Sequence, residues 1–338
     1  MQLYCGIDLH SNNCMISLIN EQDELVSEKR LANDLDAIGQ YLKRYQESIT
    51  GVVVESTYNW YWLVDGLVDQ GYPLHLANTL AIQQYNGIKY TNDASDARYL
   101  AHLLRLKILP TGFIYPKETR HLRDLLRRRL LLVKQRTAQI VSLQNMINRH
   151  SGQTLSGAKA KQLDSETLPS YFTDLSARFA AENAVLLQNQ IAVQIAQIEE
   201  FVMRYCQQSE NFARLQTVPG IGKILAMTIL LETGPIERFP QAGHYSSYAR
   251  CVPSDKISNG KTKGKGNAKN GNRYLALAFM EAAHYATIWS PEIKRFYQRK
   301  CKKVPLMVAK KTIANKLTRA CYHMLTEKTG FDVSRAFG

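Results

Sequence analysis

No apolar run in the sequence is long enough to cross a membrane: the longest, Ile224–Leu231, has eight residues, whereas a spanning helix needs about 20. The first residues contain no basic, apolar leader, which predicts that there is no secretory signal. The six cysteines lie far apart and form no Cys-x-x-Cys pair, which favours reduced, buried thiols in a cytoplasmic protein. With 10 prolines in 338 residues and 45% hydrophobic residues, the chain is expected to fold rather than remain disordered.

Acidic residues are few in two long stretches of the chain. Residues 117–149 contain nine basic and two acidic side chains, and residues 256–328 contain seventeen basic and three acidic ones. Because the formal net charge is +14, the rest of the chain is net acidic. Two separate basic regions favour a polyanion, above all nucleic acid, as the partner. For either region alone, a solvated helix face is the alternative.

The N-terminal third has the pattern of an α/β domain. A three-strand meander, then alternating helices and strands, is predicted over residues 1–112. The expected strands are 3–8, 14–19, 25–30, 51–55 and 73–77, and the expected helices are 35–45, 58–69 and 95–106. The run at 51–55 is apolar up to its final glutamate, as in a sheet that is covered on both faces.

The remaining two thirds are predicted to be mainly helical. Leucine and isoleucine recur at helical spacing over 117–148 and again over 177–205, around a Gly/Ser/Lys-rich break, which indicates an arm at 113–210. An antiparallel coiled-coil hairpin and a dimerisation arm are both compatible with this pattern. The region 211–338 is expected to contain further helices at 223–231, 241–250, 273–287, 291–301 and 306–326, with a loop at 253–271.

Four carboxylates stand at the ends of predicted elements. Asp8 ends the first strand, Glu55 ends the apolar strand, and Asp93 and Asp96 begin a helix at a spacing of three, which places both on one face. Hard cations such as Mg²⁺ take oxygen ligands, and a carboxylate cluster can hold one or two of them against a phosphate. Taken singly, each residue has a structural explanation as a helix cap, a turn residue or a strand end.

Two sets of motifs carry a family resemblance. The first is a strand ending in GID, a later apolar strand ending in E, and DxxDA at a helix start; the second is VPGIG followed by YARCVPSDKISNGKTKGKGNAKNGNRYLALAFMEAAHYA. Together they resemble, in the same order and over essentially the whole chain, the DEDD transposases of the IS110 family. These include the Piv-type DNA invertases, and the IS1111 branch is the most similar.

The resemblance implies a fold and a chemistry. The N-terminal domain would be a RuvC-like domain of the RNase H fold that binds Mg²⁺, with Mn²⁺ as an alternative, through Asp8, Glu55, Asp93 and Asp96. The domain at 211–338 would carry a nucleophilic serine that becomes covalently linked to DNA. Alignment on SNGK places that serine at Ser258; Ser246, Ser247 and Ser254 are the alternatives if the register differs.

The resemblance also implies partners. These are donor and target DNA, a structured guide RNA encoded by the element (a bridge RNA), and further copies of the chain in a dimer or tetramer. The enzyme would act in the bacterial cytoplasm, at the nucleoid, as a transposase or an invertase.

Nucleic-acid contacts are predicted at two kinds of position. The turn VPGIG is similar to a helix-hairpin-helix element, in which backbone N–H groups hold a phosphate; a plain tight turn is the alternative. Basic side chains are expected to contact the phosphate backbone without reading bases. The predicted residues are Gly220 and Gly222 in the turn, and Arg127, Arg128, Lys134, Lys261, Lys263, Lys265, Lys269 and Arg273 among the basic side chains.

Two other functions fit the same residues. One is a structure-selective nuclease of the RNase H fold that uses metal-activated water alone, and it predicts that Ser258→Ala keeps cutting DNA. The other is a non-catalytic nucleic-acid-binding protein with structural carboxylates, and it predicts no lost activity in Asp8→Asn.

Overall fold

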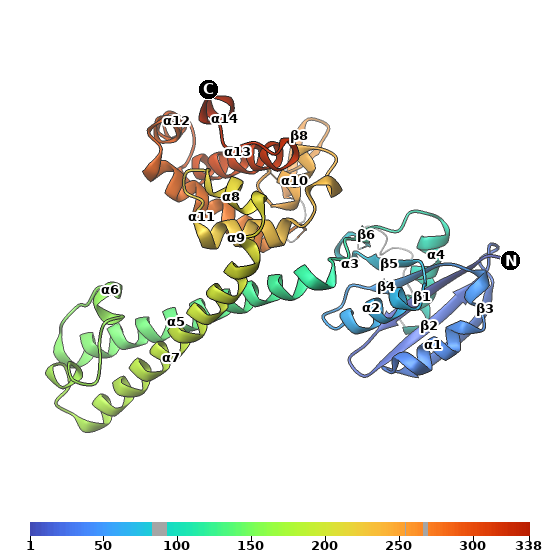
Figure 1. Ribbon diagram of the computed structural model, residues 1–338, viewed down its shortest axis with the longest axis horizontal. Helices are drawn as coiled ribbons and strands as arrows, with labels where there is room; N and C mark the ends of the chain where they lie inside the picture. The colour runs from blue at the N-terminus through green and yellow to red at the C-terminus, as the bar shows by residue number, and fades with distance from the viewer. Residues whose placement is uncertain (83–92, 254, 266–269) are drawn as a thin grey trace. The chain divides into compact units, whose positions relative to one another are not determined.

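Figure 1 shows the computed structural model, which describes residues 1–82, 93–253, 255–265 and 270–338. The chain divides into two compact units, Met1–Lys117 and Glu118–Gly338. Residues of the predicted arm and of the C-terminal region thus belong to one unit, here called the helical unit. The division at 1–112, 113–210 and 211–338 stays a prediction.

The N-terminal unit contains a mixed sheet. Within the described residues its strands are β1 (Leu3–Leu9), β2 (Asn13–Ile19), β3 (Leu25–Ala32), β4 (Ile49–Glu55), β5 (Leu74–Ala77) and β6 (Thr111–Gly112). Their order is β3-β2-β1-β4-β5-β6; β1 to β3 form an antiparallel meander, and β4 and β5 run parallel to β1 and to each other. The expected strands and the α/β class are therefore confirmed.

Helices cover both faces of this sheet. α1 (Leu35–Lys43) and α2 (Tyr61–Asp69) pack on the face that buries Ile7 and Val54, whereas α4 (Asp93–Arg105) packs on the opposite face beside Val53. Burial on both sides explains why β4 is apolar along its length. The short helices η1 (Gln46–Ser48) and α3 (Thr79–Ile82) lie in the connections.

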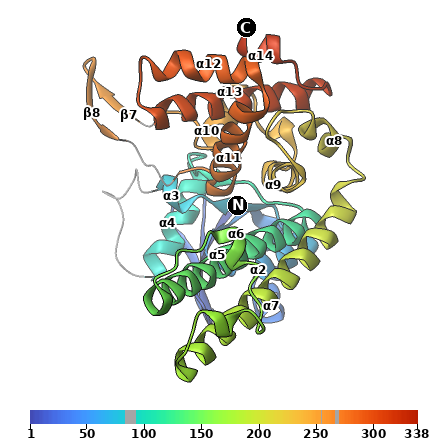
Figure 2. The ribbon, with the colours of Figure 1, turned by 90° about the vertical axis from the view of Figure 1, so that its left-hand side faces the viewer.

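In the helical unit, α5 (Lys117–Ser151) and α7 (Leu175–Cys206) form an antiparallel hairpin (Figures 1 and 2). Near its closed end, Leu143 and Ile147 of α5 pack with Val185 of α7 and with the connection that contains α6 (Gly157–Ala160) and η3 (Leu168–Ser170). Farther along, Leu132 packs against Ile191 and Ile195. The predicted long helices are thus present, and they pair antiparallel; coiled-coil packing and dimerisation through this arm stay predictions.

The rest of the helical unit is a bundle around one apolar core. Its helices are α8 (Glu210–Gln216), α9 (Lys223–Thr233), η4 (Ile236–Arg238), α10 (Ala242–Tyr248), α11 (Arg273–Trp289), α12 (Pro291–Cys301), α13 (Leu306–Glu327) and α14 (Val333–Phe337). Tyr245, Phe279 and Leu317 are fully buried at its centre. Leu122 and Leu126 of α5 belong to the same core, so this helix also supports the bundle.

The segment 253–271, predicted to be a loop, differs in the structure. It contains an antiparallel hairpin of β7 (Asp255–Ser258) and β8 (Lys261–Lys265), which Figure 2 shows reaching out from the bundle. Asn259 and Gly260 between the strands have φ angles of 50° and 70°, as a type I′ turn requires. The Asn-Gly pair signals this turn in the sequence, but the flanking Lys and Gly residues lack the apolar alternation that indicates strands.

Two expectations about composition can be compared with the structure. The six cysteines are free thiols, and all except Cys301 are buried. Within the described parts of the chain, the helices are too short or too polar to span a membrane.

Candidate active site and nucleic-acid interface

The four predicted carboxylates lie around the carboxyl ends of β1 and β4. These strands are parallel neighbours, with Ile7 opposite Val54, so the next residues, Asp8 and Glu55, lie side by side at the carboxyl ends of the two strands. Their side chains are close enough that Glu55 lowers the pKa of Asp8, against the larger effect of burial. The chain thus brings two carboxylates that are far apart in sequence into direct contact.

A glycine brings the other two carboxylates to these strand ends. Gly6 in β1 lies directly under α4, and a Cβ at this position would overlap the carbonyl oxygen of Ala97. Because the helix approaches so closely, Asp93 and Asp96 in its first turn lie near Asp8, and both raise the pKa of that carboxyl.

Two basic side chains also contact the cluster. His10 Nε2 lies 3.4 Å from Asp8 Oδ2 and 3.3 Å from Asp93 Oδ2, and Arg30 Nη2 donates a hydrogen bond of 2.6 Å to the same Asp93 oxygen. The bond from Arg30 is the main reason that the pKa of Asp93 is lowered. The pKa of Asp8 is raised, chiefly by burial, against the opposing effects of His10 and of Glu55.

The donor atoms of the cluster suit a divalent cation. Ligand atoms of Asp8, His10 and Asp93 all lie within 4.8 Å of one another, and Glu55 and Asp96 add carboxylate oxygens beside them. Oxygen-rich sites of this kind fit Mg²⁺ or Mn²⁺. His10 was not among the predicted ligands; its position two residues after Asp8 is the signal in the sequence.

Ser258 is the last residue of β7 and pairs with Lys261 across the turn. It is exposed, so its hydroxyl is accessible to a large substrate. Of the alternatives, Ser246 is fully buried in α10, whereas Ser247 is exposed; Ser254 lies outside the described residues. Burial makes Ser246 unsuitable for attack on DNA.

The basic residues predicted to contact nucleic acid fall into three groups. Exposed ones are Arg128 and Lys134 on α5, Lys261 and Lys263 on β8, and Arg273 at the start of α11. Lys265 ends β8, and Lys269 lies outside the described residues. Arg127 instead points into the helical unit, where Glu232 accepts two hydrogen bonds from it. Nucleic-acid contact by these residues stays a prediction.

The VPGIG turn joins α8 to α9 and lines a groove of about 790 Å³ beside α5 and α11. Gly220 has a φ of 89°, and a Cβ there would meet the backbone of Ala282 and Ala286, so this glycine is required by the packing of the turn on α11. Gly222 is the N-cap of α9 and has open space around it. Of the two, Gly222 is the one that a phosphate could approach without moving α11.

Comparisons with known proteins extend these observations. One family model, for DEDD transposases of IS110 elements and described as "Transposase", matches residues 5–151; another, described as "Transposase IS116/IS110/IS902 family", matches residues 212–298. The first match contains the carboxylate cluster, and the second contains the β7–β8 hairpin with Ser258.

Individual relatives come from bacterial insertion sequences. The chain is 23% identical over 298 residues to the transposase of element IS1111A from Coxiella burnetii, an alignment that covers 82% of this chain and 76% of the relative. It is 32% identical over 85 residues to an uncharacterised protein of element IS110 from Streptomyces coelicolor, which covers 25% of this chain and 21% of that protein. A transposase of element IS1328 from Yersinia enterocolitica is 25% identical over 171 residues, or 48% of this chain and 49% of the relative.

Proposed function

Since the chain belongs to the IS110 family of transposases and is therefore an enzyme that recombines DNA, we propose that it cuts and rejoins strands with two kinds of group. One is the carboxylate cluster of Asp8, Glu55, Asp93 and Asp96, and the other is the Ser258 hydroxyl. The observation that carries the proposal is that Asp8, at the carboxyl end of β1, interacts with Glu55 of β4 and with Asp93 and Asp96 of α4, and that Asp8 and Asp93 share a possible ligand group with His10. The meander followed by parallel strands supports a RuvC-like fold for this unit.

The four carboxylates would hold Mg²⁺, with Mn²⁺ as the alternative. When bound, the metal would supply positive charge that stabilises the phosphoryl group in the transition state. Burial and mutual repulsion have already raised the pKa of Asp8, so cation binding relieves an unfavourable charge. His10 and Arg30 both contact Oδ2 of Asp93 and so orient this carboxylate.

Ser258 would act as the nucleophile. Its Oγ attacks the phosphorus, a serine–phosphate bond forms, and one bond from phosphorus to a deoxyribose oxygen breaks. The serine loses its proton and the departing deoxyribose oxygen gains one. In the reverse direction, a deoxyribose hydroxyl of the partner strand attacks the phosphoserine and releases the serine. Each transfer exchanges one phosphorus–oxygen bond for another, so strands are rejoined without consuming water or a nucleotide.

The test is a search for the covalent adduct. Purified protein is incubated with Mg²⁺, RNA from the flank of its element and labelled donor and target DNA, and a denaturing gel reports protein–DNA bands that survive heat and detergent. We expect an adduct in the wild type and in Ser247→Ala, which alters an exposed serine nearby, and none in Ser258→Ala. We expect Asp8→Asn to abolish the adduct while DNA affinity is kept.

Other outcomes select the rival functions. Metal-dependent cleavage that persists in Ser258→Ala without an adduct would favour a hydrolytic nuclease with the four carboxylates as its whole site. Equal activity of Asp8→Asn and the wild type would favour a non-catalytic role for the cluster.

We further propose that a structured bridge RNA guides the reaction. The support is the amount of basic surface: β8 and α11 to α13 lie in the stretch with seventeen basic residues and three acidic ones. The protein would hold RNA through its shape and phosphates, while base pairing supplies the sequence choice. Removing the flanking RNA should abolish joining, and changing its pairing segment should redirect the target.

A homo-oligomer, a dimer or a tetramer, is also part of the proposal. Its support is a row of exposed apolar side chains on α7, where Phe179, Leu186 and Val193 recur every seven residues and are 57–68% exposed. Such a stripe favours helix–helix contact between chains. Light scattering should give a mass above that of the 38.4 kDa chain, and Leu186→Glu should lower it.

A further inference from the structure

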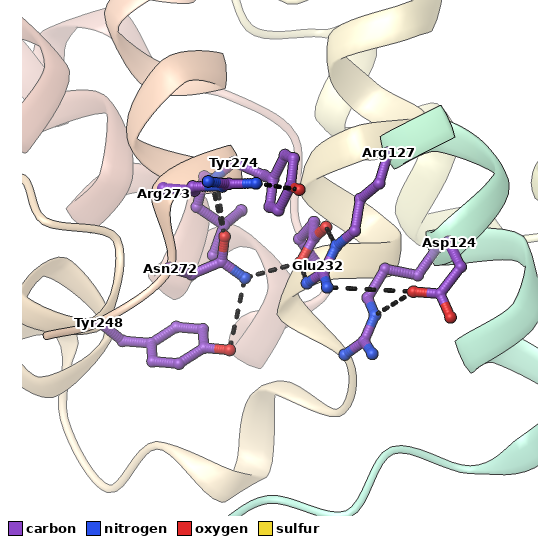
Figure 3. A network of polar contacts seen from close by, with 9 residues as sticks. Asp124, Arg127, Glu232, Tyr248, Asn272, Arg273 and Tyr274 are labelled. Atoms are coloured by element: carbon purple, nitrogen blue, oxygen red, sulfur yellow. Dashed lines mark hydrogen bonds and ion pairs between the residues drawn. The ribbon is translucent and has the colours of Figure 1, made fainter. Parts of the chain in front are cut away.

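A buried carboxylate in the helical unit lies at the junction of three segments (Figure 3). Glu232 of α9 is 1% exposed. It accepts hydrogen bonds of 2.6 and 2.7 Å from Nε and Nη2 of Arg127 on α5. Burial alone would lower the pKa of Arg127, but these bonds and the charge of Glu232 outweigh it and raise that pKa. The ion pair therefore ties α9 to α5 in one geometry.

The third segment is the start of α11, which follows the segment that contains the β7–β8 hairpin. Asn272 donates a hydrogen bond of 2.6 Å from Nδ2 to Oε2 of Glu232. With its other atom, Oδ1, it accepts from the N–H groups of Tyr274 and Leu275 and so caps α11. One side chain thus fixes both the first turn of α11 and its distance from α9.

The start of the same segment is held against its end. Arg250, which has a φ of 55°, donates from Nε and Nη2 to the carbonyl of Gly271, at 3.0 and 2.7 Å. Tyr248 accepts a hydrogen bond from the backbone N–H of Asn272. The two ends of the 251–270 segment are therefore clamped together, and Asn272 joins the clamp to Glu232 and Arg127.

The energetics suggest that this network specifies geometry. A buried ion pair can often be replaced by apolar side chains of similar volume without loss of stability, because desolvation offsets the attraction between the charges. Apolar packing would not fix the relative orientation of α5, α9 and α11 as the two hydrogen bonds from Arg127 and the one from the Asn272 side-chain amide do. The network therefore fixes where Asn272, just after the segment that carries the hairpin, lies relative to α5.

We propose that Arg127, Glu232 and Asn272 are positioning residues, which hold the base of the β7–β8 hairpin on α5 and thereby orient Ser258 for attack on DNA. The proposal rests on the proposed role of Ser258. A link to α5 matters because α5 is the helix that continues directly from the N-terminal unit: it begins at Lys117, the last residue of that unit. Its later turns pair with α7.

The main test removes the link to α5 without leaving a buried charge. In the double variant Arg127→Met with Glu232→Gln, the new amide can still accept from Asn272, but the two bonds to α5 are lost. The matched control is Arg129→Met with Glu199→Gln, which removes another ion pair of α5, at 2.7 Å, that joins it to α7 instead. Three quantities are measured: the rate of adduct formation at saturating DNA, DNA affinity, and amide hydrogen exchange over 255–265.

We expect the first double variant to form the adduct about 10- to 100-fold more slowly, since small misplacement of a reacting group has costs of this size. Its DNA affinity should stay within about twofold, and exchange in 255–265 should accelerate. The control should keep both the rate and the exchange of the wild type. Equal losses in the two double variants, or no loss in the first, would overturn the proposal.

A single substitution tests the other link. Asn272→Ser keeps a good helix cap but is too short to reach Glu232, which stays paired with Arg127. We expect this variant, like the double variant, to form the adduct more slowly and to exchange amide hydrogens in 255–265 faster. An unchanged rate of adduct formation would contradict a role for Asn272.

Failure of the proposed function gives a different result. If Ser258→Ala forms the adduct at the wild-type rate, then the nucleophile is another group and the assignment of Ser258 is wrong. The exchange measurement still decides about the clamp in that case, because faster exchange in the first double variant but not in its control would show that the network holds the hairpin.

Discussion

The two units surround their buried acidic side chains in opposite ways. Asp8 in the N-terminal unit is 4% exposed and lies among other carboxylates, so burial and like charges raise its pKa. Glu232 in the helical unit is 1% exposed, yet Arg127 and Asn272 satisfy it with three hydrogen bonds. A buried carboxylate therefore does not by itself indicate a ligand site. Concentrated negative charge favours a cation, whereas a neutralised carboxylate favours a structural or positioning role.

The strongest test of this contrast is Asp8→Asn. We expect strand cleavage and joining to fall about a thousandfold or more, because metal binding contributes several kcal/mol to the transition state. In metal-free buffer at pH 7 the variant should be at least as stable as the wild type. The raised pKa means that ionised Asp8 is disfavoured in the fold, so above its pKa the charge costs stability, and asparagine removes that cost. Gel assays and thermal unfolding measure the two effects.

Added Mg²⁺ provides the control for this variant. It should raise the Tm of the wild type, because a ligand that binds the folded state stabilises it, and should leave the Tm of Asp8→Asn unchanged. A lower Tm of the variant in metal-free buffer would contradict the view that ionised Asp8 destabilises the folded protein.

Glu232→Ala should have the opposite effect on stability. It leaves Arg127, whose side chain is 30% exposed, without its bidentate partner and removes the acceptor of the 2.6 Å bond from Asn272, so we expect the free energy of unfolding to fall by about 3 kcal/mol. The matched variant Glu199→Ala removes a carboxylate that is 31% exposed, against 1% for Glu232, and should cost at most about 1 kcal/mol. Urea denaturation measures both. Equal losses would mean that the degree of burial of the pair is unimportant.

Gly6→Ala should weaken the carboxylate cluster without changing any of its charges. The added methyl group meets the backbone of α4 at Ala97, which should cost about 1–3 kcal/mol as overpacking does. Because α4 must move, Asp93 and Asp96 separate from Asp8, and the rise in Tm on adding Mg²⁺ should shrink. Gly157→Ala, at a position with open space, should leave both quantities near those of the wild type.

The smallest expected effect concerns the other end of α4. Burial opposes ionisation of Asp23, but hydrogen bonds from His102 and Arg105 of α4 outweigh it and lower the pKa of Asp23. Because a lowered pKa adds stability above the unfolded value, about 3.9, Asp23→Asn should lose at most about 1 kcal/mol at pH 7 at this partly exposed site. The difference between variant and wild type should shrink as the pH falls below about 4 and disappear below the lowered pKa of Asp23.

Asn is a suitable replacement for Asp23 because residue 23 has a φ of 71°, which Asn tolerates. The comparison therefore isolates the charge from the backbone. A loss that persists unchanged at pH 3 would show that the charge is not its cause.

Much of the N-terminal unit could be predicted from the sequence. The alternation of strands and helices is local, and once β1 and β4 are taken as parallel neighbours, Asp8 and Glu55 must lie together at the carboxyl ends of these strands. The prediction stopped at residues whose role depends on distant neighbours. Arg30 lies on β3, and only the pairing of β3 with β2 brings it to Asp93.

The helical unit was less accessible from the sequence. Periodicity predicts α5 and α7, but Arg127, Glu232 and Asn272 are separated by up to about 145 positions, and no local pattern connects them. The lone acid in the apolar stretch around Glu232 is a signal that a partner exists, without saying which. For Arg127, sequence reasoning predicted a contact with nucleic acid, whereas its observed partner is inside the unit.

The length of α5 limits how this chain can change. The helix continues for 35 residues; its early turns place Leu122 and Leu126 in the bundle core, and its later turns place Leu143 and Ile147 in the core of the hairpin. Each residue advances the helix by about 100°. One residue inserted near Lys134 would rotate one pair relative to the other by that angle, and one core would lose its side chains to solvent. The helix therefore sets the rotation of one core relative to the other, and changes in its length of about seven or eleven residues, which restore that rotation to within about 20°, disturb the two cores least.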